Sequence, residues 1–231
     1  MSSPLIVHHL ETSRSHRVLW LLEELGVDYE LRLYRRDPRT RLAPAELKRL
    51  HPLGKSPVIT HDSLVIAESG AILEYLAETF AHRASGELGH LLPATGTAEH
   101  RANRFWMHYA EGSLMNWLLM QFVFQQIPRQ PMPFFVRPVA RRICEQVQRR
   151  LIMPNVTTAL EFIDEALASQ PWFAGSHLTL ADFQMSFAME AALAMSTATD
   201  RYSHMQAWLR RARQRPAYQR ALQKGGPILM S

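Results

Sequence analysis

The pair Glu68-Ser69 stands where a predicted strand, 64–67, meets a predicted helix that runs from Ser69 to about Phe80. Serine is a favoured residue at a helix N-cap, and the free amide groups and the dipole of a helix start favour an anion. The same pair would also serve as an ordinary cap, in which Glu68 only complements the helix dipole. The residues themselves leave both interpretations open, an anion-binding site and a simple cap.

Hydroxyl side chains also gather before an earlier predicted helix. Thr12, Ser13 and Ser15 stand at the start of a segment whose apolar residues recur at i, i+3, i+4 and i+7, namely Val18, Leu21, Leu22 and Leu25. Gly26 closes this segment as a helix C-cap would. Ser13, which opens the segment, can cap the helix.

Short strands and helices must position these groups. Leu5–His9 is a short apolar run, Tyr29–Tyr34 alternates polar and apolar residues, and both patterns predict strands. The connection between them is long enough for a parallel crossover. A short helix is predicted from Pro44 to Leu50, followed by strands at 57–60 and 64–67. The order strand-helix-strand-helix-strand-strand-helix is the α/β thioredoxin-like arrangement.

The remainder of the chain has helical patterns. From Ala84 to Thr97 the chain is rich in Gly, Pro, Ser and Thr and loses its periodicity, which indicates a linker. Helices are then predicted over about 97–127, 134–168, 179–195, 204–213 and 216–223. Thr179 and Asp182 form a capping-box pattern. We therefore expect a thioredoxin-like N-terminal domain at 1–83, a linker at 84–96, and an all-α C-terminal helical domain at 97–231.

Three motifs, in this order, resemble the cytosolic glutathione S-transferases, most closely their bacterial and fungal serine-type members. They are residues 13–26 (SRSHRVLWLLEELG), residues 51–58 (HPLGKSPV) followed by 67–76 (AESGAILEYL), and residues 173–182 (FAGSHLTLAD). The resemblance covers nearly the whole chain. It implies the glutathione transferase fold and a homodimer, with the first domain of one subunit against the second domain of the other.

The resemblance also implies a glutathione-binding site at Lys55, Ser56, Pro57, Glu68 and Ser69. In that family the proline matching Pro57 is cis, and the preceding residue offers its backbone N–H and C=O to the cysteinyl unit of glutathione, which adds like a short strand. Without the flanking motif, the same Ser-Pro dipeptide would be an ordinary turn. The γ-glutamyl carboxylate would lie at Ser69 and its ammonium near Glu68.

The thiolate, not the thiol, is the good nucleophile, and an unperturbed cysteine thiol has a pKa of about 8.5. Glutathione is therefore mostly un-ionised at neutral pH unless the protein favours its thiolate. Ser13 matches the thiolate-stabilising serine of serine-type members, since it precedes Arg17 by four residues where the helix begins. Thr12 and Ser15 are alternative donors. The first tyrosine is Tyr29 and the single cysteine is Cys144, so the tyrosine-type and cysteine-type members match poorly.

The activity implied by this resemblance is attack of the thiolate on a small hydrophobic electrophile, with glutathione as co-substrate and no further cofactor. The electrophile pocket is expected beside the start of the first helix, with Trp106, Met107, His108, Tyr109, Met115 and Phe122 as candidate wall residues, although most could equally fill the helical core. Two alternatives remain, a glutathione-dependent peroxidase acting on organic hydroperoxides, and a ligand-binding or protein-interaction module without enzymatic activity.

Composition excludes several other classes of protein. Residues 1–85 hold 11 Lys+Arg and 11 Asp+Glu, whereas residues 86–231 hold 15 and 10, so the surplus of positive charge lies on the predicted helices. No nucleic-acid motif accompanies these arginines, so we expect no nucleic-acid partner. We also expect no membrane span and a cytoplasmic location, because no long apolar run or signal peptide occurs. His8 and His9 lack further ligands at metal spacing, so no metal site is expected.

Overall fold

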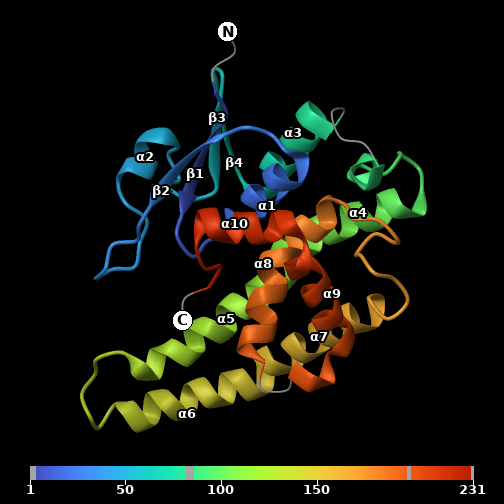
Figure 1. Cartoon of the computed structure of the whole chain (residues 1–231). Helices are drawn as coiled ribbons and strands as arrows, with labels where there is room; N and C mark the ends of the chain where they lie inside the picture. Colours follow the sequence, from blue (N-terminus) through green and yellow to red (C-terminus); the bar gives the residue numbers. More distant parts are fainter. Residues whose placement is uncertain (1–3, 82–85, 197–198, 230–231) are drawn as a thin grey trace.

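The computed structural model describes residues 4–81, 86–196 and 199–229. Its first part contains a four-stranded sheet in the order β2-β1-β3-β4 (Figure 1). The strands are β1 (Ile6–Leu10), β2 (Glu30–Tyr34), β3 (Val58–His61) and β4 (Leu64–Ala67). β1 runs parallel to β2 and antiparallel to β3, which in turn pairs antiparallel with β4. The predicted thioredoxin-like order and its parallel crossover are therefore confirmed.

Three helices accompany the sheet, α1 (His16–Leu25), α2 (Glu46–Leu50) and α3 (Ser69–Phe80). Every residue of α1 from His16 to Glu23 is buried, because the last helix of the chain, α10 (Pro216–Gly225), packs back onto it (Figure 1). Gly26 ends α1 with a φ of 62°, the left-handed conformation expected of a C-cap glycine. The first helix of the chain thus lies between the sheet and the last one.

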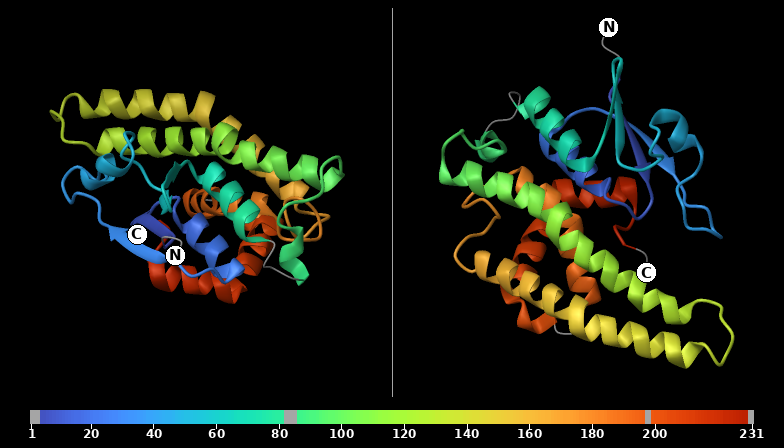
Figure 2. Two further views of the ribbon diagram at one scale, coloured as in Figure 1. Left: turned by 90° about the horizontal axis from the view of Figure 1, so that it is seen from above. Right: turned by 180° about the vertical axis from the view of Figure 1, so that it is seen from behind.

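The rest of the described chain is helical. Two long antiparallel arms, seen side by side in Figure 2, each consist of two α-helices joined by a π-helical turn. The elements are α4 (Ala98–Tyr109), η3 (Ala110–Leu114), α5 (Met115–Gln126), α6 (Arg137–Val147), η5 (Gln148–Ile152), α7 (Met153–Ala166), α8 (Leu180–Met195) and α9 (Ser203–Gln214). The predicted helices at 97–127 and 134–168 therefore agree with the arms, 98–126 and 137–166, to within three residues at each end, apart from the π turns. No helix among the described residues is both long and apolar enough to cross a membrane.

Some boundaries differ from the predictions by a few residues. Ser13 precedes α1, and its carbonyl accepts a hydrogen bond from the N–H of His16 (3.4 Å), which forms a tight turn before the helix. Ser69 is the first residue of α3, and Glu68 occupies the N-cap position that was predicted for Ser69, but the side chain of Glu68 accepts no capping hydrogen bond. The expected start of the linker at residue 84 lies outside the described residues, and a short 3₁₀ helix, Gly86–His90, follows within the predicted linker.

A buried carboxylate fixes the centre of the helical part. Asp182 accepts hydrogen bonds from the backbone N–H of Phe173 (3.0 Å) and Thr179 (2.9 Å), and from the indole N–H of Trp208 (2.9 Å). The side chain is fully buried, and the capping box predicted from Thr179 and Asp182 is confirmed at the start of α8. One carboxylate therefore joins the loop before α8, the start of α8 and α9.

We expect Asp182→Asn to lower the free energy of unfolding by about 2–4 kcal/mol, because the amide NH₂ group would face a buried donor and leave it unpaired. Denaturant unfolding followed by circular dichroism measures this change. Asp164→Asn is the matched control: Asp164 accepts from the N–H of His204 and Met205 at the start of α9, but its side chain keeps 16% of its surface exposed. Equal losses in the two variants would contradict the central role of Asp182.

Candidate functional site

A groove of about 200 Å³ opens at the junction of the sheet and the helical part. The two segments singled out by the sequence meet there, although 10 residues separate Pro57 from Glu68 in the chain. The lining residues are Arg14, His51, Leu53, Lys55, Ser56, Pro57, Ala67, Glu68, Ser69 and Glu111. The structure thus brings together all five residues expected to contact glutathione.

The floor of the groove is tied to β1. The peptide bond between Ser56 and Pro57 is cis, as the resemblance implied. The Ser56 hydroxyl donates to the backbone carbonyl of His8 (3.0 Å) and accepts from the backbone N–H of Leu10 (3.1 Å). Because this hydroxyl already has its partners, a ligand contact from Ser56 would come from its backbone.

Glu68 and Ser69 form the opposite wall, where β4 passes into α3. Glu68 has φ 71° and ψ 122°, a conformation that costs free energy for a residue with a Cβ. Ser69 begins α3, and its hydroxyl oxygen accepts from Nη1 of Arg17 (3.0 Å). The hydroxyl hydrogen of Ser69 therefore remains available to donate to an anion at the helix start.

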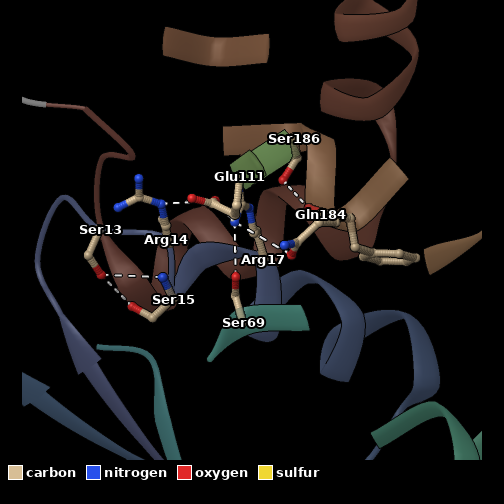
Figure 3. Close-up of polar contacts among 9 residues, drawn as sticks. Ser13, Arg14, Ser15, Arg17, Ser69, Glu111, Gln184 and Ser186 are labelled. Atoms are coloured by element: carbon tan, nitrogen blue, oxygen red, sulfur yellow. Dashed lines mark hydrogen bonds and ion pairs between the residues drawn. The ribbon is translucent and has the colours of Figure 1, made fainter. Parts of the chain in front are cut away.

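A buried arginine organises this wall (Figure 3). Nη1 of Arg17 donates to Oε1 of Glu111 (2.6 Å), which also accepts from Nε of Arg14 (3.0 Å). Nη1 of Arg17 also lies 3.5 Å from Oε1 of Gln184 on α8. Arg17 is fully buried, and burial lowers its pKa to about 10, although the carboxylate of Glu111 raises this pKa in part. The guanidinium therefore stays charged at neutral pH. Burial disfavours the carboxylate of Glu111, but Arg17 and Arg14 more than offset this and hold its pKa below the usual value.

The sequence analysis did not identify Arg14 and Glu111 as groove residues, and it used Arg17 only to locate Ser13. Arg17 directly precedes the apolar run 18–22, and this position was a signal that its side chain could be buried and would then need a partner. Nothing local indicated Glu111, which lies 94 residues further on in the π turn η3.

Ser13 lies beside the groove but is not one of its lining residues. Its side chain is buried, the hydroxyl donates to the backbone carbonyl of Leu10 (2.6 Å), and its oxygen lies 2.7 Å from Oγ of Ser15. Ser15 has no exposed surface, so it cannot contact a ligand without rearrangement. Thr12 has φ 46° and its hydroxyl accepts from Nε of Arg36 (3.4 Å). Ser15 therefore has no surface open to a ligand in this arrangement, whereas Ser13 and Thr12 stay candidates.

Most of the other residues singled out by the sequence lie in the core or contact other parts of the fold. Trp106, Met107 and Met115 are buried in the core, whereas Phe122 is 40% exposed on α5. His8 and His9 point to different partners, and no metal-binding group of three His, Cys, Asp or Glu side chains occurs within the described residues.

The groove itself is lined by carboxylates (Glu68 and Glu111), cations (Arg14 and Lys55), the start of α3 and the backbone of Ser56. This combination is suited to a zwitterionic peptide.

Comparison with known proteins agrees with this geometry. The model of the glutathione S-transferase N-terminal domain matches residues 4–78, and that of the glutathione S-transferase C-terminal domain matches residues 146–216. The chain is 34% identical to glutathione S-transferase 3 of Schizosaccharomyces pombe, over 95% of this chain and 87% of that protein. It is 30% identical to glutathione S-transferase 1 of Saccharomyces cerevisiae, over 97% of each.

A solved structure is also similar. A glutathione S-transferase from Actinobacillus pleuropneumoniae aligns with a TM-score of 0.73 and 28% identity, over 97% of this chain and 94% of that one. Family models, curated relatives and structure thus agree over both the sheet and the helical part, and the chain belongs to the glutathione S-transferase family.

Proposed function

We propose that this protein is a glutathione S-transferase that binds glutathione in the groove and stabilises its thiolate for attack on a small hydrophobic electrophile. The observation that carries the proposal is the convergence of Lys55, Ser56, Pro57, Glu68 and Ser69 on one groove at the start of α3. The β3–β4 hairpin, in which Val58 pairs with Ala67, brings the two segments side by side, and Arg14 and Glu111 from other parts of the chain complete the lining. Binding of an anionic peptide would explain why these polar and charged groups line one groove.

The groups of the groove match those of glutathione one by one. The γ-glutamyl carboxylate would bind at the start of α3, where the Ser69 hydroxyl and the free backbone amides can donate to it. The ammonium would lie by Glu68 and Glu111, the two carboxylates of the lining. The cysteinyl unit would pair with the backbone of Ser56, and Lys55 would lie near the second carboxylate of the peptide.

The thiol then lies towards the turn that precedes α1. A hydrogen bond to a charged group is worth roughly 1.5–3 kcal/mol, which lowers a thiol pKa by about one to two units. In this proposal Ser13 turns its hydroxyl from the carbonyl of Leu10 to the sulfur. The enzyme accelerates the reaction by positioning glutathione and by favouring its thiolate, and needs no further cofactor.

We assign the two parts of the chain separate roles. Residues 1–83 form the glutathione-binding domain, 84–96 the linker, and 97–231 the helical domain that supplies the electrophile pocket. Because glutathione is the thiol that poises the redox state of the cytosol, we place the enzyme in the cytoplasm.

We also propose a homodimer. Apolar side chains lie exposed on α5, on α6 and on the connection between them, and soluble monomers rarely leave so many uncovered. They are Leu119, Phe122, Val123, Ile127, Phe134, Phe135, Val136, Val139 and Ile143. Leu64 and Val65 on the edge strand β4 are also about half exposed, at 47% and 46%. Packing the arms of one subunit against the first domain of the other would cover both sets.

Ser13→Ala should reduce conjugation at pH 7 by roughly 10- to 100-fold, because the loss of about 1.5–3 kcal/mol raises the thiol pKa by one to two units. Glutathione affinity should change little, and the defect should shrink as the pH approaches about 9, where the thiol ionises unaided. The ultraviolet absorbance of bound thiolate gives the direct measurement. Thr12→Ala is the control, and full thiolate absorbance in the Ser13 variant would remove Ser13 from the mechanism.

Glu68→Gln should weaken glutathione binding roughly 10- to 100-fold, because a charge-assisted hydrogen bond to the ammonium is lost. Calorimetric titration with glutathione and with S-methylglutathione measures the dissociation constant independently of thiol ionisation. Glu74→Gln removes the same charge from an exposed position on α3 and should leave the affinity unchanged. An unaltered dissociation constant in the Glu68 variant would show that the ammonium binds elsewhere.

Sedimentation velocity at micromolar concentration should show a dimer. Phe134 and Phe135 are 87% and 66% exposed. Replacing both with serine should shift the protein towards monomer, because the partner subunit would then cover less apolar surface. Leu42→Ser serves as control, since Leu42 is 67% exposed in a loop of the first domain. A monomer in the unmodified protein would refute the proposed assembly.

A further inference from the structure

The turn that leads from β1 into α1 contains a strained residue directly before Ser13. Thr12 has φ 46°, in the left-handed region, where a β-branched side chain rarely occurs. Such a conformation costs free energy and persists only where neighbouring groups hold it in place. The contacts of Thr12 therefore identify the groups that set the direction in which the chain enters Ser13.

The side chain of Arg36, which follows β2, holds this turn. Its Nη2 donates to the backbone carbonyl of Thr12 (3.2 Å), and its Nε donates to the Thr12 hydroxyl (3.4 Å). Its Nη1 donates to the backbone carbonyl of Arg41 (3.1 Å), which anchors the guanidinium in the loop before α2. One rigid planar group thus contacts the turn and the loop at the same time.

The backbone supports the turn only up to the residue before Thr12. The N–H of Glu11 donates to the carbonyl of Tyr34 (3.0 Å), and Oε1 of Glu11 accepts from the backbone N–H of Arg36 (2.8 Å). These two bonds continue the contact of β1 with β2 as far as Glu11. At Thr12 itself, the contacts with this segment come from the guanidinium of Arg36.

Ion pairing does not explain the position of Arg36. Its side chain is half-buried, and among the described residues its guanidinium donates to two backbone carbonyls and one hydroxyl but forms no ion pair. Burial first, and then the charge of Arg41, lower the pKa of Arg36, and the carboxylate of Glu11 opposes this in part. A partly buried cation with neutral acceptors costs free energy, which points to a role in the turn.

We propose that Arg36 is a positioning residue for the thiolate of glutathione. It keeps Thr12 at positive φ, and this conformation sets where Ser13, the next residue, presents its hydroxyl. Arg36 does not line the groove, so it acts through Ser13 and not on the sulfur. The inference rests on the proposed function, because it takes Ser13 as the thiolate donor. It adds the group that fixes the direction of that donor.

Two substitutions of Arg36 separate its geometry from its charge. Arg36→Lys keeps the positive charge but loses the planar fork, whereas Arg36→Gln loses both. Each should raise the pKa of the bound thiol by about one unit, which lowers the thiolate present at pH 7 about three- to tenfold. Titration of the ultraviolet absorbance of bound thiolate measures this pKa.

Two controls distinguish positioning from a general loss of structure. The affinity for S-methylglutathione, measured by calorimetry, should stay unchanged in both variants, since Arg36 does not line the groove. Arg35→Gln removes an exposed charge next to Arg36 and should leave the thiol pKa unchanged.

A double-mutant cycle shows whether Arg36 acts through the Ser13 hydroxyl. In the Ser13→Ala background, Arg36→Gln should cause no further change in the thiol pKa, because the hydroxyl that Arg36 positions is gone. Thr12→Gly should compensate for Arg36→Gln, because glycine adopts positive φ without steric cost. The thiol pKa of the variant with both changes should therefore return towards that of the unmodified enzyme.

The outcomes separate this inference from the proposed function. An unchanged thiol pKa in Arg36→Lys would overturn the inference, because charge alone would then suffice, and would leave the glutathione S-transferase activity in place. An effect of Arg36→Gln that persists without the Ser13 hydroxyl would overturn it as well, since Arg36 would then act on the sulfur directly. So would the absence of any recovery with Thr12→Gly. Failure of the unmodified enzyme to form thiolate would overturn both proposals.

Discussion

The fully buried guanidinium of Arg17 is the constraint on which the site depends. A charge without solvent must be paired, and removing one partner of a buried ion pair typically costs about 3–5 kcal/mol. Arg17 lies on α1, and its contacts are Ser69 on α3, Glu111 in η3 and Gln184 on α8. Four elements that are distant in the sequence are therefore held at fixed positions by the need to compensate one charge. The need to compensate this charge therefore also fixes the wall of the groove at Ser69 and Glu111.

The π turn η3 is part of the same arrangement. A π-helical turn inserts an extra residue into a helix and so shifts the side chains that follow it. In this chain the turn places Glu111 between Arg14 and Arg17 at the groove, while Leu114 and Met115 face the core. The aromatic ring of Phe187 on α8 supports both guanidinium groups, whose central carbons lie 5.5 and 5.7 Å from the ring centroid. The wall thus combines charge pairing with cation–π contact.

Local patterns predicted most of the fold, because strand alternation, helix periodicity and capping depend on near neighbours. The strand 64–67 and the helix from Ser69 to Phe80 were placed correctly, as was the capping box at Asp182. The motifs located the five groove residues, because resemblance carries information about distant contacts that periodicity does not. The hydrogen-bond partners of Arg17, Ser13 and Ser15 could not be predicted. They depend on which groups from separate elements meet in the core, and on where a helix gains a π turn.

The histidines show the same limit. Consecutive residues of a strand face opposite sides of the sheet, so His8 and His9 have different surroundings despite their identical chemistry. His8 contacts Tyr34 and Thr60 on neighbouring strands, whereas His9 points to Ser15 and the carbonyl of Gly225. The sequence analysis expected no metal site at this pair, because further ligands at metal spacing are lacking, but it did not indicate that the surroundings of each ring depend on the face that α10 covers.

The return of α10 onto α1 also has a consequence for biosynthesis. A Cβ added at Gly225 would lie 2.6 Å from Leu19 Cδ1 and 3.0 Å from His9 Cε1, so the end of α10 contacts the first helix too closely for a larger residue. The apolar face of α1 is synthesised about 200 residues before the helix that covers it. On the ribosome, the nascent first domain therefore keeps this face uncovered until α10 has been synthesised. The part of the chain that forms the sheet, although synthesised first, is therefore not fully packed until α10 is available, and chaperones that shield apolar surfaces would act on it during that interval.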